Sequence, residues 1–178
     1  YLAMEHNLAI IPVINKIDLP SADVERVIEQ IDSELGLDSD THLKCSAKEG
    51  IGIEEILEAI IERIPPPKGD PAAPLAALIF DAKYDSFRGT VIHCRIFDGA
   101  VKAGDIIRLV YNNATYRVEE VGHFLLQRQK RESLSAGDVG YIIAGVKTVS
   151  DVRTGDTITL ENRPCPKPLP GFKEVKPV

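Results

Sequence analysis

The chain has 178 residues, 44% of them apolar, and a formal net charge of -6. This length fits one large domain or two small ones, and the apolar content is enough to bury a core. The acidic balance, with a pI near 5.3, excludes RNA binding by bulk positive charge, because phosphate affinity depends on many Lys and Arg side chains. Any contact with RNA must therefore be local, and no contact with DNA is expected.

Features that mark a cellular compartment point to the cytoplasm. No apolar run reaches the length of a membrane-spanning helix, and the N-terminus lacks the pattern of a secretion signal. Cys45, Cys94 and Cys165 form no Cys-x-x-Cys pair and no metal-ligand pattern, so we expect three free thiols and no metal site. Both Tyr1 and Val178 lie at abrupt ends, and we expect the chain to be a piece of a longer protein.

The first third of the chain alternates strands and helices. The apolar run at 9–14 predicts a buried parallel strand, and the helical spacing of apolar residues over 24–35, ended by a glycine, predicts an amphipathic helix. A second strand at 43–45 and a second helix over 53–64 repeat the pattern. This order predicts an α/β half-domain with parallel strands over residues 1–67.

A polar motif, Asn15-Lys16-Ile17-Asp18, follows the first predicted strand directly. The carboxylate of Asp18 suits guanine, because it can accept from both the ring N–H and the exocyclic amine, a donor pair that adenine lacks. The Asn15 amide can either form a hydrogen bond with the other edge of the base or link neighbouring loops to each other. The aliphatic stem of Lys16 suits one face of the ring.

A second motif, Ser46-Ala47-Lys48, follows the second predicted strand. Here the Ala47 N–H can donate a hydrogen bond to the guanine carbonyl, and the Lys48 side chain can cover the second face of the ring. Loops at the carboxyl ends of parallel strands are where open α/β sheets bind ligands. Each motif alone is equally explained by a solvated turn or a chance match. Together, in this order and each after a strand, they favour guanine recognition.

The remainder of the chain changes to a β-rich pattern. Residues 68–74 have the composition of a linker, residues 75–162 predict an all-β barrel, and the proline-rich stretch 163–178 predicts a connector to a further domain. The expected strands cover 75–84, 90–97, 105–111, 115–121, 138–144 and 156–160. A Gly-Asp pair opens three of them, and the glycines Gly104, Gly137 and Gly155 suit turns that need a positive φ.

Two segments of the barrel region have both a structural and a functional interpretation. In Tyr84–Gly89, we expect Phe87 to pack on the barrel and Gly89 to permit a turn, with a contact to the preceding α/β half-domain or to a partner as the alternative. The densest basic cluster, with Arg128, Lys130 and Arg131, is expected in a loop. Such clusters are usually solvated surface, and the alternative is a local contact with RNA.

These motifs resemble those of a known family. The tetrapeptide at 15–18 and the tripeptide at 46–48 resemble the last two of the five G-protein motifs, which contact the base. A following barrel with the segment 99–105 resembles the second domain of translational elongation factors, which Ras-like and Era-like GTPases lack. Within that group the chain resembles the LepA, or elongation factor 4, family. The segments that carry this finer resemblance are 15–22, 84–89 and 168–178.

The resemblance implies a parent protein that hydrolyses GTP to GDP and phosphate on the ribosome. It further implies contact with ribosomal RNA, ribosomal proteins and tRNA, a proposed role in moving misplaced tRNAs backward or rescuing stalled elongation, and peripheral association with the inner membrane. The family's phosphate-binding loop, switch Thr and Asp-x-x-Gly-His segment do not occur in these 178 residues, so Mg²⁺ is expected only in the parent, and the chain alone is expected to be inactive. No catalytic role is assigned to any histidine, that is, to His6, His42, His93 or His123.

Two alternatives remain open. One is another translational GTPase, of the translocase, BipA or ribosome-protection type. The other is a non-catalytic RNA-binding or scaffold module with a degenerate base motif, against which the intact Asn15, Lys16 and Asp18 weigh.

Overall fold

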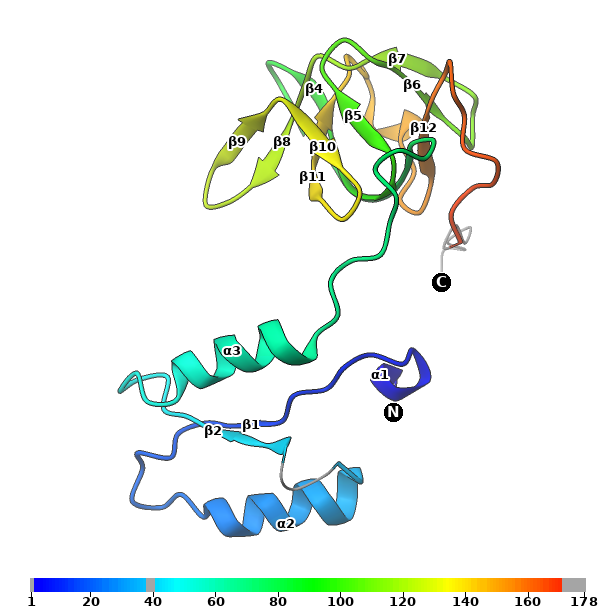
Figure 1. Cartoon of the computed structure of the whole chain (residues 1–178). Coiled ribbons are helices and arrows are strands. Elements are labelled where there is room, and N and C mark those ends of the chain that lie inside the picture. The colour runs from blue at the N-terminus through cyan, green and yellow to red at the C-terminus, as the bar shows by residue number, and fades with distance from the viewer. Residues whose placement is uncertain (1, 38–40, 171–178) are drawn as a thin grey trace, which may run out of the picture. The chain divides into compact units, whose positions relative to one another are not determined.

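The computed structural model describes residues 2–37 and 41–170 (Figure 1). The chain forms two compact units, Tyr1–Pro66 and Pro67–Val178, here called unit 1 and unit 2. Unit 1 contains the helices α1 (Leu2–Glu5), α2 (Val24–Leu35) and α3 (Ile53–Arg63) and two strands, whereas unit 2 is built from antiparallel strands. The predicted fold class is therefore confirmed.

The two strands of unit 1, β1 (Val13–Ile14) and β2 (Leu43–Lys44), pair in parallel as predicted. The first strand is shorter than the expected 9–14, because only its last two residues have a partner strand. Val13 is 41% exposed, so the expectation of a strand buried on both faces is wrong for this residue. The helices α2 and α3 lie on opposite sides of the strand pair (Figure 1).

The ends of α2 are set by its flanking residues. Asp23 caps the N-terminus, where its Oδ1 accepts the Arg26 N–H at 3.1 Å. Gly36 takes a left-handed conformation at φ 63° and donates its N–H to the Asp32 carbonyl, which ends the helix as predicted. The second predicted helix is also confirmed, over Ile53–Arg63.

Unit 2 contains an eight-stranded antiparallel sheet in the order β7-β6-β12-β3-β4-β11-β8-β9, and a separate pair, β5-β10. Its core consists of apolar side chains with almost no exposure from most of these strands. A short 3₁₀ turn lies at Val149–Asp151. The strands are β3 (Ala76–Asp85), β4 (Gly89–Asp98), β5 (Ala100–Lys102), β6 (Ile106–Leu109), β7 (Thr115–Arg117), β8 (Glu120–Phe124), β9 (Arg128–Arg131), β10 (Ser133–Ser135), β11 (Val139–Ile143) and β12 (Thr157–Leu160).

The structure corrects two parts of the strand prediction. The run at 115–121 is not one strand but β7 followed by β8, and β5, β9 and β10 were not predicted. Between β7 and β8, Val118 exchanges two backbone hydrogen bonds of 2.8 Å with Gly104 and Asp105. This exchange ties the β7–β8 connection to the β5–β6 turn and so draws distant parts of the sheet together.

The repeated Gly-Asp pairs form tight turns. Gly104, Gly137 and Gly155 have φ values of 94°, 96° and 89°, a region that only glycine enters without strain. In the turns Lys102–Asp105 and Ser135–Asp138, the carboxylate of the last residue accepts the N–H of the first, at 2.9 and 2.7 Å. The predicted structural role of the pairs is confirmed.

The segment after β12 is fastened to that strand. The Cys165 N–H donates to Thr159 Oγ1 at 2.7 Å, and the Leu169 N–H donates to Thr157 Oγ1 at 2.9 Å. Part of the expected connector thus packs on unit 2, and its remainder, 171–178, lies outside the described residues. Among the helices of the described chain, none is long and apolar enough to cross a membrane.

Candidate nucleotide-binding site

The two polar motifs of unit 1 lie side by side at the ends of β1 and β2. Beyond the strand pair, the ladder continues through the Cys45 N–H, which donates to Ile14 O at 2.8 Å, and the Ile17 N–H, which donates to Cys45 O at 3.2 Å. Both loops therefore leave the same edge of the parallel pair, as the sequence predicted.

The side chain of Asn15 links the two loops. Its Oδ1 accepts hydrogen bonds from the Lys16 N–H at 2.7 Å and the Ala47 N–H at 3.1 Å, and the thiol of Cys45 approaches at 3.5 Å. Of the two roles expected for Asn15, the structure therefore shows the tie between loops. The Ala47 N–H, expected to donate to a guanine carbonyl, is engaged with Asn15, so a ligand must share this donor.

The backbone of Lys16 has an unusual conformation. Its φ of 66° lies in the left-handed region, which costs a residue with a side chain roughly 1–3 kcal/mol. Hydrogen bonds on both sides hold it there, since its N–H donates to Asn15 and its carbonyl accepts the Leu19 N–H at 3.2 Å. Strain of this kind is typical of binding sites whose shape is fixed before the ligand arrives.

The second loop is closed on itself. The backbone of the fully buried Ser46 exchanges hydrogen bonds of 2.9 and 3.1 Å with Ile51, and its Oγ accepts the Glu49 N–H at 3.2 Å. These bonds leave Ala47 and Lys48 exposed at the loop's tip. The ion pair of Lys48 with Glu49, at 3.3 Å, is exposed and contributes little to stability.

A cavity of about 390 Å³ lies between the loops, within the size range of small-molecule sites. Its polar walls include the half-buried carboxylate of Asp18, to which no described residue donates a hydrogen bond. The structure brings all six predicted residues together here. The lining consists of Asn15, Lys16, Asp18, Leu19, Ser46, Ala47 and Lys48.

Leu19 is the lining residue that sequence reasoning missed. It also lines an adjacent cavity of about 170 Å³, and it is 46% exposed. The sequence signal for this role was the position of Leu19, an apolar residue directly after the polar motif at 15–18. Within the described part of the chain, no cluster of three or more His, Cys, Asp or Glu side chains is arranged to hold a metal ion.

The basic cluster lies on a strand and not in a loop, which corrects the prediction. β9 pairs with β8, with Arg128 opposite Phe124 and Lys130 opposite Gly122. Because side chains alternate along a strand, Arg128 and Lys130 share one face and Arg131 takes the other. Arg128 is moreover paired with Asp85, with 2.8 Å between Nη2 and Oδ2.

The turn between β3 and β4 also differs from its prediction. Phe87 is 96% exposed, so it does not pack on the barrel. Asp85 Oδ1 shapes the turn by accepting the N–H groups of Phe87 and Arg88 at 3.0 and 3.2 Å. Gly89 has the expected positive φ, 75°.

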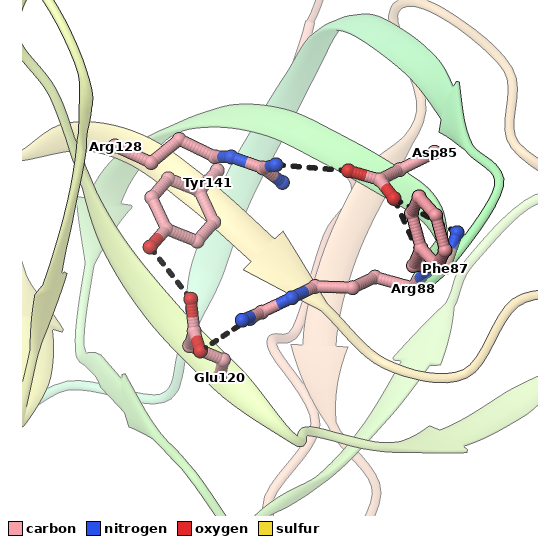
Figure 2. Close-up of polar contacts among 6 residues, drawn as sticks. All are labelled: Asp85, Phe87, Arg88, Glu120, Arg128 and Tyr141. Carbon is pink, nitrogen blue, oxygen red and sulfur yellow. Dashed lines mark hydrogen bonds and ion pairs between the residues drawn. The ribbon is translucent and has the colours of Figure 1, made fainter.

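One further polar contact connects this turn to the sheet, and a second joins two strands of the sheet at the same carboxylate (Figure 2). Arg88 Nη1 lies 2.6 Å from Glu120 Oε2, and the Tyr141 hydroxyl donates to Glu120 Oε1 at 2.8 Å. Burial of Glu120 raises its pKa, but the hydrogen bonds from Tyr141 and Arg88 outweigh burial and lower it. Burial and the bond to Glu120 raise the pKa of Tyr141 to about 12.

Two of the four histidines belong to unit 2 and have structural partners. His93 packs against Phe124 with ring centroids 4.3 Å apart, and its Nδ1 lies 3.4 Å from Asp81. Burial lowers the pKa of His93. His123 lies 3.5 Å from Asp138.

Comparison with known proteins gives matches over both units. The model of the elongation factor Tu GTP binding domain matches residues 1–66, and that of elongation factor Tu domain 2 matches residues 89–159. Curated proteins named elongation factor 4 are similar over the whole chain, with 81% identity in Syntrophus aciditrophicus, 66% in Syntrophobacter fumaroxidans and 56% in Thermotoga maritima. The chain spans about 30% of the length of these relatives.

The fold also resembles that of solved translation factors. The apo structure of translation elongation factor SelB from Methanococcus maripaludis has a TM-score of 0.74 at 22% identity, over 90% of this chain and 35% of that one. Its complex with the GTP analogue GppNHp has a TM-score of 0.72 at 20% identity, over 90% of this chain and 36% of that one. At this identity the likeness supports the fold alone.

Proposed function

Because the chain belongs to the elongation factor 4 family, we propose that unit 1 is the guanine-binding end of a GTPase domain. The observation that supports this most is the cavity of about 390 Å³, in which six predicted residues from two loops meet. In the same proposal, residues 1–67 are the C-terminal part of the GTP-binding domain, 68–74 the linker, 75–162 a domain like the second domain of elongation factors, and 163–178 the connector.

The roles of the lining residues follow from their free polar groups. The carboxylate of Asp18, to which no described residue donates a hydrogen bond, accepts from the guanine ring N–H and exocyclic amine. Since Oδ1 of Asn15 already ties the loops together, its amide nitrogen is the group that donates to the other edge of the base. The aliphatic stems of Lys16 and Lys48 cover the two faces of the ring.

The proposal for the parent protein is a cytoplasmic GTPase that hydrolyses GTP to GDP and phosphate on the ribosome. Its cofactors are GTP or GDP with Mg²⁺ held by residues outside these 178, and its role is to move misplaced tRNAs backward or rescue stalled elongation. The names of the relatives and the two family models support the translational assignment. Contact with tRNA and peripheral association with the inner membrane stand on the family resemblance alone.

A contact of β9 with ribosomal RNA is a further part of the proposal. Arg128 is already paired with Asp85, so its charge is less available to phosphate. Lys130 and Arg131 are exposed, and neither forms an ion pair with another described residue. They are the members of the basic cluster that we expect to contact phosphates.

The substitution Asp18→Asn in the full-length protein tests guanine recognition. It replaces one acceptor by a donor, which opposes the guanine amine but suits the oxygen that xanthine carries at that place. GTP binding should weaken by about 1–3 kcal/mol for each polar group left unpaired, and XTP binding should strengthen. Asp32→Asn, on the exposed surface of α2, is the matched control and should leave both affinities unchanged. A variant that still prefers GTP to XTP in competitive binding would remove Asp18 from this role.

A further inference from the structure

The segment that enters unit 2 is held against that unit along most of its length. Residues 68–74 have the composition of a flexible linker, yet the turn between β4 and β5 binds Asp70 on both sides. The Asp70 N–H donates to Asp98 Oδ1 at 2.9 Å, and the Asp70 carbonyl oxygen accepts the Gly99 N–H at 2.9 Å. Asp70 Oδ1 also accepts the Ala72 N–H at 2.8 Å, which closes the segment into a turn.

Two glycines mark places where this segment and the strands of unit 2 approach each other more closely than a side chain would allow. A Cβ on Gly69 would lie 2.1 Å from the carbonyl oxygen of Phe97, near the end of β4. A Cβ on Gly99 would lie 2.6 Å from both the N and the Cα of Leu75, whose side chain belongs to the core of unit 2. We call residues 69–74 the strap, because these contacts fasten the segment at both of its ends.

The chain first meets unit 2 at Pro67. A Cβ on Gly137, in the turn between β10 and β11, would lie 3.2 Å from Pro67 Cβ, so the proline ring lies against this turn. The division of the chain into compact units falls at the same place, between Pro66 and Pro67. Pro65 and Pro66 therefore separate Ile64, which caps α3, from the first contact with unit 2.

The backbone at these two prolines has little freedom to rotate. Their rings fix φ at about −65°. Ile64, Pro65 and Pro66 each precede a proline, and this confines their ψ angles to the extended region. Ile64 has φ −92° and ψ 118°, in agreement with this restriction. Proline-rich segments of this kind are semi-rigid spacers that extend about 3.1 Å per residue.

The helix α3, from which the prolines continue, is itself fastened within unit 1. At its C-terminal end, Arg63 Nη1 donates to the carbonyl oxygen of Thr41 at 2.6 Å. At its N-terminal end, Gly52 lies so close to β2 that a Cβ would come within 2.1 Å of the Lys44 carbonyl oxygen. The loop of the candidate nucleotide site leads directly into α3, so the site and the prolines lie at opposite ends of the same helix.

We propose that Pro65 and Pro66 form a stiff joint that limits the orientations of unit 2 relative to α3. The joint is shorter than the composition suggests, because residues 68–74 follow the surface of unit 2 and contribute no slack. A change in the direction of α3 is then passed on to unit 2 and is not absorbed by a flexible tether. The joint goes beyond the proposed function and does not depend on guanine or ribosome binding.

Distance distributions measured by pulsed electron paramagnetic resonance test the stiffness of the joint. Nitroxide labels are attached through p-acetylphenylalanine in place of Glu58 on α3 and Lys102 on β5, both exposed, since the chain has cysteines of its own. We expect a narrow distribution for the unsubstituted joint. Pro65→Gly combined with Pro66→Gly should broaden it about twofold or more, because glycine-rich segments behave as flexible coils.

The matched control places two adjacent glycines in the strap, by combining Pro71→Gly with Ala72→Gly. Both positions are exposed, as Pro65 and Pro66 are, but the strap is held by the hydrogen bonds of Asp70. The width of the distribution should therefore equal that of the unsubstituted chain. Circular dichroism and thermal melts confirm that the variants fold, as the exposure of the four positions leads us to expect.

Each other outcome would overturn the proposal. A distribution as broad in the unsubstituted chain as in the Pro65 and Pro66 variant would show a loose tether. Equal broadening by the control would show that the strap is not fastened. A distribution that stays narrow in the Pro65 and Pro66 variant would show that the prolines do not set the orientation. None of these measurements involves nucleotide or ribosomes, so guanine recognition by Asp18 is tested separately.

Discussion

Two glycines beside the proposed nucleotide site allow a sharp test of its backbone geometry. Gly50 and Gly52 have nearly equal φ values, 74° and 73°. A Cβ on Gly52 would lie 2.1 Å from the carbonyl oxygen of Lys44, in β2, whereas a Cβ on Gly50 would meet no atom within 4 Å. Alanine at the two positions thus imposes the same backbone cost, and only Gly52→Ala adds a clash.

The two costs can be separated in magnitude. The left-handed conformation costs alanine about 1–2 kcal/mol, which is the whole effect expected for Gly50→Ala. At Gly52 the overlap is with the backbone, so the loop or β2 must shift, and such displacements typically cost a further 1–3 kcal/mol. We therefore expect Gly52→Ala to destabilise unit 1 by about 2–5 kcal/mol.

Denaturant unfolding followed by far-ultraviolet circular dichroism measures this difference. The helical band reports mainly on unit 1, because α1, α2 and α3 belong to it and unit 2 is built from strands. Gly52→Ala should move the midpoint to lower denaturant than Gly50→Ala does, or abolish the helical transition. Equal destabilisation by the two variants would show that no clash with Lys44 occurs and that this loop is placed differently.

Two further predictions concern unit 2. Replacing both Lys130 and Arg131 with Ala should make the plot of log ribosome affinity against log salt less steep, by roughly one unit for each phosphate that is no longer bound. Arg128→Ala removes a charge already paired with Asp85 and should leave the steepness unchanged. A less steep plot with Arg128→Ala alone would contradict this assignment. The pKa of Tyr141 is raised from 10.0 to about 12, so its contribution to stability should be complete below pH 10.0 and lost as the pH rises towards about 12. Spectrophotometric titration should show a tyrosinate that forms near pH 12 and is absent in Tyr141→Phe. The pKa of Tyr116 is also raised by burial, so the loss of that late step in Tyr141→Phe identifies the residue, and its persistence there would contradict the reasoning.

The features that the sequence predicted well depend on short-range patterns. The helix at Val24–Leu35 follows from apolar spacing and from Gly36, which ends it by taking a positive φ. The site loops follow from polar motifs placed directly after apolar runs. In each of these cases the determining residues lie within one or two turns of each other in the sequence.

The features that the sequence missed depend on contacts between distant residues. β9 is exposed at every position, so it lacks the alternation that marks a strand, and only its pairing with β8 defines it. The exposure of Phe87 follows from the hydrogen bonds of Asp85, whose ion pair with Arg128 spans 43 positions. Composition also could not show that Oδ1 of Asn15 and the Ala47 N–H satisfy each other.

The fastening of the segment after β12 has a mechanical consequence. Two backbone N–H groups, at Cys165 and Leu169, are held by the hydroxyls of Thr159 and Thr157, both buried on β12. Because these two hydrogen bonds hold the segment at points four residues apart, it cannot swing freely as an unattached proline-rich linker would. A rotation of unit 2 would therefore carry residues up to Leu169 with it as one body. The path of the chain as it reaches Leu169 is therefore set by β12 and not by the proline-rich segment itself.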